Sequence, residues 1–151
     1  MRGLRVGAIR YVACASPAYL KRRGTPASPR DLQAHDCISF STLSSAERWS
    51  FAGRKPQRVR VKPILTVNTA EAAIDAAKAG FGVTRVLSYQ AAAPLAEGSL
   101  RLILKAYEAD ALPVHILHRE DRLPQAKVQS FIAFAAPRLR AELGGRPSRS
   151  S

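Results

Sequence analysis

Residues 64–87, ILTVNTAEAAIDAAKAGFGVTRVL, decide the fold class of this chain. The run ILTV at 64–67 is apolar and rich in β-branched side chains, and it predicts the central strand of a sheet. The small and apolar residues that follow predict a helix from residue 69 or 70 to 79, which Gly80 ends. Residues 83–87 predict another strand. A strand, a helix and a second strand in this order predict an α/β domain with a largely parallel or mixed sheet.

The same alternation continues on both sides of this stretch. Further strands are predicted at 10–15, 37–40, 49–51, 59–61, 100–104 and 113–117, because these runs are apolar or alternate in polarity. Ser16 and Ser28 stand where the N-caps of two short helices are expected. Apolar residues at helical spacing predict a last helix from about residue 124, which Pro137 should end or kink. The basic sequence of 144–151 predicts a disordered tail.

Length and composition bound the class of protein. The chain has 151 residues, of which 46% are hydrophobic, so it can form one domain with a core. No apolar run approaches the roughly 18 residues of a membrane span, and the N-terminus lacks a signal-peptide pattern. We therefore expect a soluble, cytoplasmic protein with no membrane partner. Cys14 and Cys37 lack CxxC spacing, which predicts two free, strand-buried thiols in a reducing compartment.

The charge balance is unusual, since 24 Lys and Arg against 11 Asp and Glu give a net charge of +13. Residues 1–62 hold 13 of the basic residues and three of the acidic ones. A basic cluster there comprises Arg54, Lys55, Arg58, Arg60 and Lys62, joined by Lys21, Arg22 and Arg23. This cluster is compatible with nucleic-acid binding and with the solvated face of an edge hairpin. The edge explanation is favoured, because Trp49 and Phe51 are predicted to point inward and offer no stacking platform.

Motifs that carry catalysis or metal binding are mostly missing. Gly80 and Gly82 follow a helix and precede a strand, whereas a phosphate-binding loop needs glycines between a strand and a helix start. His115 and His118 would face opposite sides of a strand, which favours edge or surface histidines over a metal site. The sequence contains neither GxSxG nor HExxH. We therefore predict no catalytic residue, no metal site, no cofactor and no enzymatic activity.

One polar junction remains at 67–70, where a predicted strand runs into a predicted helix. Asn68 can cap this helix, and Glu71 at the third helical position forms a capping-box-like pair with it. The side-chain oxygens of Asn68 and Thr69, together with the amides of the helix start, would also receive a small anion or polar effector. A cap and a ligand receptor share this geometry, and the residues alone favour the cap.

A series of short motifs resembles the second half of the effector-binding domain of LysR-type transcriptional regulators. The motifs are CASPAYL (14–20), GTP (24–26), DL (31–32), HDCISF (35–40), VN (67–68) leading into EAA (71–73), AGFGV (79–83), the segment 95–104 with Gly98 and Leu100, PV (113–114), KV (127–128) and FI (131–132). They cover about residues 10–139, and their order and spacing make the match specific. Ser88 is a departure, since many members of the family have proline at this point.

The resemblance implies a type 2 periplasmic-binding-protein-like fold, in which two α/β lobes are joined by two crossover strands. On that plan residues 1–15 form a crossover strand region and 16–110 form the complete second lobe. Residues 111–143 form the return strand and the C-terminal helix of a partial first lobe. The opening strands of the first lobe and a helix-turn-helix domain would be missing, so the chain would be truncated. The resemblance places the effector beside Asn68, Thr69, Val83, Thr84 and Arg85, and more weakly beside Phe40.

On this basis we expect a ligand-sensing and oligomerising module of a transcriptional regulator. Its partners would be an unidentified small effector, for which an anion is one option, further copies of the chain, and promoter DNA only through the missing helix-turn-helix. With half of the cleft absent, the chain alone should bind effector weakly or not at all. The final helix should expose an apolar stripe and favour self-association. The alternatives are a nonspecific nucleic-acid-binding protein and a small α/β enzyme.

Overall fold

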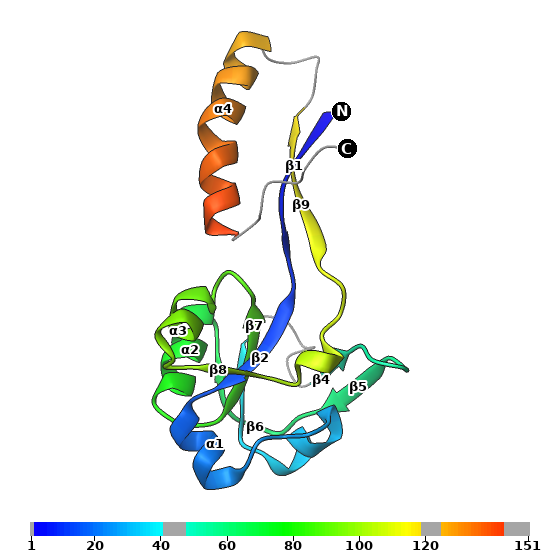
Figure 1. Cartoon of the computed structure of the whole chain (residues 1–151), viewed down its shortest axis with the longest axis vertical. Helices are drawn as coiled ribbons and strands as arrows, with labels where there is room; N and C mark the ends of the chain where they lie inside the picture. Colours follow the sequence, from blue (N-terminus) through cyan, green and yellow to red (C-terminus); the bar gives the residue numbers. More distant parts are fainter. Residues whose placement is uncertain (1, 41–47, 119–124, 144–151) are drawn as a thin grey trace. The chain divides into compact units, whose positions relative to one another are not determined.

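The structure, a computed structural model, describes residues 2–40, 48–118 and 125–143. Contacts within the chain divide it into two compact units, and Figure 1 labels most of their helices and strands. Unit 1 comprises Met1–Ile9 and Ala111–Ser151, and unit 2 comprises Arg10–Asp110. Unit 2 is therefore continuous in sequence, whereas unit 1 is formed by the two ends of the chain.

Unit 2 is organised around a five-stranded sheet with the strand order β6-β3-β7-β2-β8. The strands are β2 (Tyr11–Ala15), β3 (Cys37–Phe40), β6 (Pro63–Val67), β7 (Val83–Leu87) and β8 (Arg101–Ile103). β3 runs parallel to β6 and β7, whereas β2 runs antiparallel to β7 and β8. The prediction of an α/β domain with a mixed sheet is confirmed.

The prediction that 64–67 forms the central strand is wrong. These residues belong to β6 at the edge of the sheet, where Ile64 and Leu65 leave 55% and 40% of their surface exposed. The central strand is β7, in which Val83, Thr84 and Val86 are fully buried. Both segments are apolar and β-branched, so their composition does not distinguish the edge of a sheet from its centre.

Two helices cover one face of this sheet. They are α2 (Ala70–Lys78) and α3 (Ala92–Glu97), of which the sequence analysis missed the second. The core on this side consists of Val12, Cys14, Ile38, Ala73, Ile74, Ala77, Val86, Ala91 and Leu100. β2, β3 and β7 thus send alternate residues to the helices, as the two-residue period of a strand requires.

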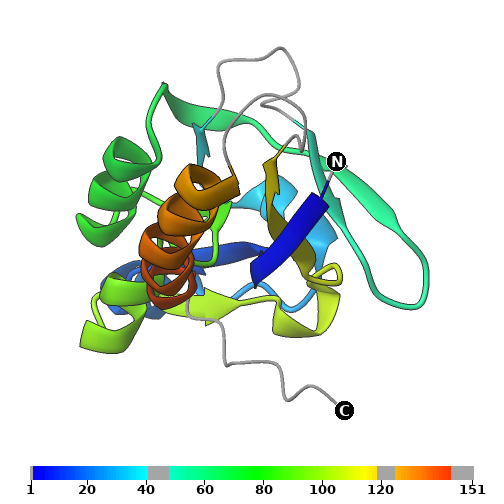
Figure 2. The ribbon, with the colours of Figure 1, turned by 90° about the horizontal axis from the view of Figure 1, so that it is seen from above.

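The opposite face carries shorter elements. These are α1 (Pro17–Arg23), the 3₁₀ helices η1 (Pro29–Ala34) and η2 (Lys105–Tyr107), and a hairpin of β4 (Arg48–Phe51) and β5 (Gln57–Arg60). Trp49, Phe51 and Val59 point from the hairpin into the core, as their alternation predicts. The hairpin forms a separate two-stranded sheet, and its turn projects from the rest of unit 2 in both views (Figures 1 and 2).

The short helices begin where the capping serines predict. Ser16 Oγ accepts a hydrogen bond from the Tyr19 amide at 3.1 Å, and Pro17 occupies the first turn of α1. Ser28 precedes η1, and its amide donates to the Asp31 carboxylate at 3.1 Å. The element after Ser28 is a 3₁₀ helix of six residues.

Unit 1 consists of the antiparallel strands β1 (Arg2–Ile9) and β9 (Leu112–His118) and the helix α4 (Gln125–Glu142). α4 packs against both strands. The helix continues through Pro137, so of the two predicted effects of this proline, an end or a kink, the end does not occur. Beyond the proline, Leu143 packs on Gly7 and Arg140 donates to the carbonyl of Arg5 at 3.4 Å. These contacts with β1 hold the last turn despite the hydrogen bond that proline removes.

The predicted exposure of apolar residues on the final helix is confirmed for Phe131 and Leu139, which expose 61% and 37% of their surface. Phe134 adds a further exposed ring, with 59% of its surface exposed. The side chain of Val128 and the predicted tail at 144–151 lie outside the described residues. Within the described ranges, no helix has the length and apolarity needed to cross a membrane.

Candidate functional site

The strongest candidate site lies where β3 and β6 end. The two strands are parallel, and Phe40 pairs with Val67, so their carboxyl ends meet at one edge of the sheet. Asn68 and Thr69 follow directly and are exposed, whereas Phe40 is half-buried against the core beneath α2. Ligands of open α/β sheets commonly bind at such edges. The structure therefore brings together three of the six predicted effector residues.

The start of α2 is capped by Thr69. Its hydroxyl oxygen accepts a hydrogen bond from the Ala72 amide at 3.1 Å, and its carbonyl accepts one from the Ala73 amide at 3.2 Å. The prediction that Asn68 caps this helix is wrong, and Glu71 at the second helical position forms no capping box with it. Thr69 has the extended backbone that an N-cap requires, which places Asn68 one residue outside the helix. The side-chain carboxamide of Asn68 therefore takes no part in the cap.

Val83 and Thr84 lie inside the sheet and present no exposed surface. The Thr84 hydroxyl donates to the carbonyl of Ile38 at 3.1 Å and so links β7 to β3. β3 separates β7 from β6, so these residues are one strand further from Asn68 than the prediction assumed. Their side chains support the sheet behind the candidate site.

The Arg85 side chain points to the face of the sheet away from α2, where the β4–β5 hairpin lies. Its guanidinium stacks 4.2 Å from the centre of the Tyr11 ring and donates to the carbonyl of Ser50 at 3.0 Å. The Phe51 ring lies 5.6 Å away. Burial lowers the pKa of Arg85, yet a guanidinium in a protein keeps its charge. Arg85 therefore ties β7 to β4 through stacking and a charged hydrogen bond.

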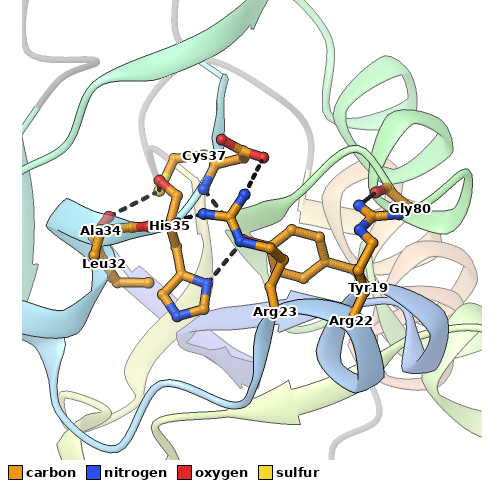
Figure 3. Close-up of polar contacts among 9 residues, drawn as sticks. Tyr19, Arg22, Arg23, Leu32, Ala34, His35, Cys37 and Gly80 are labelled. Atoms are coloured by element: carbon orange, nitrogen blue, oxygen red, sulfur yellow. Dashed lines mark hydrogen bonds and ion pairs between the residues drawn. The ribbon is translucent and has the colours of Figure 1, made fainter.

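A polar cluster that sequence reasoning missed joins α1 to the start of β3 (Figure 3). The Tyr19 hydroxyl lies 2.8 Å from His35 Nδ1 and accepts a hydrogen bond from the Asp36 amide at 3.1 Å. Arg23 donates to the Asp36 carboxylate at 3.0 Å and to the carbonyl of Ala34. Burial raises the pKa of Tyr19, and burial together with the Arg23 charge lowers the pKa of His35. The spacing of Tyr19 and His35 gives no sign of this contact.

Both cysteines are free and buried, which confirms the prediction for their thiols. Burial raises the pKa of Cys14 to about 12, and burial and the Asp36 charge raise that of Cys37 to about 12. The Cys37 thiol lies 3.6 Å from the carbonyl of Leu32, to which it donates. A thiol with so high a pKa is a poor nucleophile at neutral pH.

The predicted basic cluster divides into two places in unit 2. Arg58 and Arg60 point outward from β5, whereas Val59 between them points into the core. On α1, Arg22 donates to the carbonyl of Gly80 at 3.1 Å, and Arg23 pairs with Asp36. The two α1 arginines therefore also stabilise the fold, although they and Lys21 are exposed like the cations of the hairpin.

The other polar groups of the described residues are weaker candidates for a ligand or metal site. A shallow groove of about 450 Å³ between α2 and α3 includes Glu71, Asp75 and Glu97, so it is unfavourable for an anion. Among the residues that the structure describes, no three His, Cys, Asp or Glu side chains form a group that could hold a metal ion.

Comparison with known proteins identifies the family. A family model described as the LysR substrate binding domain matches residues 1–140. The chain belongs to the LysR substrate-binding domain family. The predicted resemblance is therefore confirmed, and with it the type 2 periplasmic-binding-protein-like α/β fold. LysR-type regulators bind small-molecule effectors and form oligomers.

Relatives of this LysR domain are transcriptional regulators. The probable HTH-type transcriptional regulator LtrA of Klebsiella pneumoniae is 34% identical over 101 residues, which are 66% of this chain and 33% of that protein. The HTH-type transcriptional regulator CrgA of Neisseria meningitidis serogroup B is 25% identical over 137 residues, 90% of this chain and 46% of that protein. The chain thus spans between a third and about half of the length of these relatives.

Solved structures of LysR proteins share the fold. The regulatory domain of AphB in Vibrio vulnificus superposes with a TM-score of 0.78 at 21% identity, over 88% of this chain and 67% of that chain. The structure of CrgA from Neisseria meningitidis gives a TM-score of 0.77 at 24% identity, over 91% of this chain and 47% of that chain.

Proposed function

We propose that this chain is the effector-sensing and oligomerising module of a LysR-type transcriptional regulator and acts in the cytoplasm. Residues 16–110 would form the second lobe of the effector domain, with 1–15 as a crossover region and 111–143 as the return strand and C-terminal helix of the first lobe. The continuous unit Arg10–Asp110, with its own sheet and core, supports a lobe that ends at residue 110, and this unit also includes β2 from the crossover region. Promoter DNA would be read by a helix-turn-helix domain outside these 151 residues.

The observation that carries this proposal is the exposed pair Asn68 and Thr69 at the carboxyl end of β6, directly before α2. The N-terminus of a helix carries partial positive charge and amide donors, which favour an anionic group. The Asn68 side chain can donate and accept hydrogen bonds from its place outside the cap. We infer a small anionic or polar effector, such as a carboxylate, with Phe40 as an apolar neighbour.

Val83, Thr84 and Arg85 would contribute indirectly. Thr84 fixes β7 to β3, and Arg85 fixes β7 to the hairpin, so both would hold the strand arrangement behind the effector. A regulatory switch then requires that the effector bind one arrangement of the complete domain more tightly than another. No bond of the effector is made or broken, and neither cofactor nor metal takes part.

A thermal-shift screen of small aliphatic and aromatic carboxylates tests this proposal. One wall of a cleft should give millimolar affinity, and a ligand at about ten times its Kd stabilises the folded state by about 1.4 kcal/mol. The variant Asn68→Ala should lose the shift. The variant Gln33→Ala, at another exposed polar position, should keep it. A shift that survives Asn68→Ala would contradict the assigned site.

A further inference from the structure

Among the residues that the structure describes, the charged side chains on the outer face of the β4–β5 hairpin are all positive. In the antiparallel register, Arg48 pairs with Arg60 and Ser50 pairs with Arg58, so these side chains share the face that is turned away from the core. The hairpin turn and Lys62, the second residue after β5, add further exposed cations. We call this set the basic face; it comprises Arg48, Arg54, Lys55, Arg58, Arg60 and Lys62.

Basic residues dominate this part of the sequence. Residues 48–70 contain six Lys and Arg and no Asp or Glu, and Glu47 directly precedes them. Exposed Lys and Arg side chains gathered on one element are the electrostatic pattern typical of a surface that binds a negatively charged partner.

The inner face of the hairpin restricts what that partner is. Trp49 and Phe51 are 4% and 7% exposed, so neither ring is available to stack on an unpaired base or to enter a membrane interface. What remains is a ribbon of guanidinium and ammonium groups on a regular backbone. Guanidinium groups suit phosphate oxygens, and the backbone of duplex DNA presents phosphates at a regular spacing.

We propose that the basic face binds the phosphate backbone of duplex DNA without regard to sequence. The ribbon is two strands wide, which the major groove of B-DNA admits, so the face can approach a duplex closely. Contacts of this kind position a protein on DNA and carry no sequence information. This binding is separate from the effector site at Asn68 and Thr69 and needs no effector.

The test is a salt titration of the chain with a fluorescent duplex of arbitrary sequence, read by anisotropy. Each phosphate contact contributes about 0.9 to the slope of log affinity against log salt. The triple variant Arg54→Gln/Lys55→Gln/Arg58→Gln should therefore reduce the slope by about 2.7. Its affinity at low salt should fall by about tenfold or more. These three side chains are exposed, so the fold should survive, and circular dichroism checks it.

A matched variant distinguishes the contribution of the basic face from that of the net charge of the chain. Lys21→Gln/Lys78→Gln/Arg101→Gln removes the same three charges from exposed positions on α1, α2 and β8. It should keep the slope, as should the charge-conserving variant Arg54→Lys/Arg58→Lys. An equal loss of slope in both triple variants would overturn the proposal, because net charge would then explain the binding. Binding to phosphatidylserine vesicles but not to the duplex would also overturn it. Neither outcome affects the effector proposal, since the assay contains no effector.

Discussion

The Tyr19 hydroxyl lies 2.8 Å from Nδ1 of His35, across 16 residues of sequence. The same hydroxyl oxygen accepts a hydrogen bond from the Asp36 amide at 3.1 Å. When His35 is neutral with its proton on Nε2, its Nδ1 accepts the hydroxyl proton of Tyr19. Tyr19 is fully buried, and the contact fastens α1 to the strand entry at Cys37.

The chain should lose stability in mild acid because of His35. Burial and the Arg23 charge lower the pKa of His35, and the carboxylates of Asp31 and Asp36 oppose this only in part. Below an ordinary pKa of about 6.5 the unfolded chain binds a proton that the folded chain resists. The stabilisation is therefore complete above that pH and decreases as pH falls through it toward the lower pKa of the folded state. Urea unfolding from pH 8 to pH 5 should show this decrease.

The variant His35→Gln removes the titrating group and should flatten the stability profile between pH 7 and pH 5. The variant Tyr19→Phe should cost about 1–2 kcal/mol at pH 8, because the hydroxyl loses its partly buried hydrogen bonds to His35 and to the Asp36 amide. If His35→Gln keeps the acid sensitivity of the natural chain, another group is responsible.

Gly82 is predicted to tolerate no side chain. A Cβ there would collide with the carbonyl oxygen of Asp36, the same oxygen that accepts the Val83 amide where β3 and β7 begin to pair. Gly82→Ala should cost about 3 kcal/mol or more in urea unfolding. Gly98→Ala is the control, because Gly98 has φ of +80° but open space around it. Its cost should be about 1–2 kcal/mol, and equal costs would contradict the steric argument.

Substitutions at Thr69 and Asn68 should differ in how much they lower the free energy of unfolding. Thr69→Ala removes the cap of α2 and should cost about 1 kcal/mol, whereas Thr69→Ser should retain most of it. Asn68→Ala should change stability by less than about 0.5 kcal/mol, since its side chain is exposed and outside the cap. Thermal unfolding of the three variants measures this. A larger loss for Asn68→Ala would restore Asn68 as the structural cap.

The thiols should be unreactive in the folded chain. Cys14 and Cys37 are fully buried, with pKa values raised to about 12, so a disulfide reagent at pH 8 should modify neither within minutes. The same reagent in denaturant should titrate both. Rapid reaction of either thiol under native conditions would contradict the placement of these strands in the core.

Local sequence signals predicted the elements of unit 2 but not their places in the sheet. Ser16, Gly80 and the alternation around Val59 act within a few residues, and the elements they predict are present. Strand order depends on contacts between distant segments, and so the edge position of 64–67 was missed. α3 was missed because six residues around Pro94 are too few for a periodic signal.

The candidate site was predictable to a similar extent. The junction at Asn68 and Thr69 is local, and it emerged from the residues alone. The roles of Thr84 and Arg85 were not accessible, because each depends on a partner from another strand, Ile38 in one case and Ser50 in the other. The Tyr19–His35 contact could not be predicted for the same reason, since its two residues are 16 apart in the sequence.

An NMR titration of the isotope-labelled chain with small carboxylates up to millimolar concentration tests the effector site at residues 68–72 directly. We expect the largest amide shifts at residues 68–72, with smaller ones at Thr84 and Arg85. Largest shifts in the groove between α2 and α3, or no shift at residues 68–72 with any carboxylate, would contradict it.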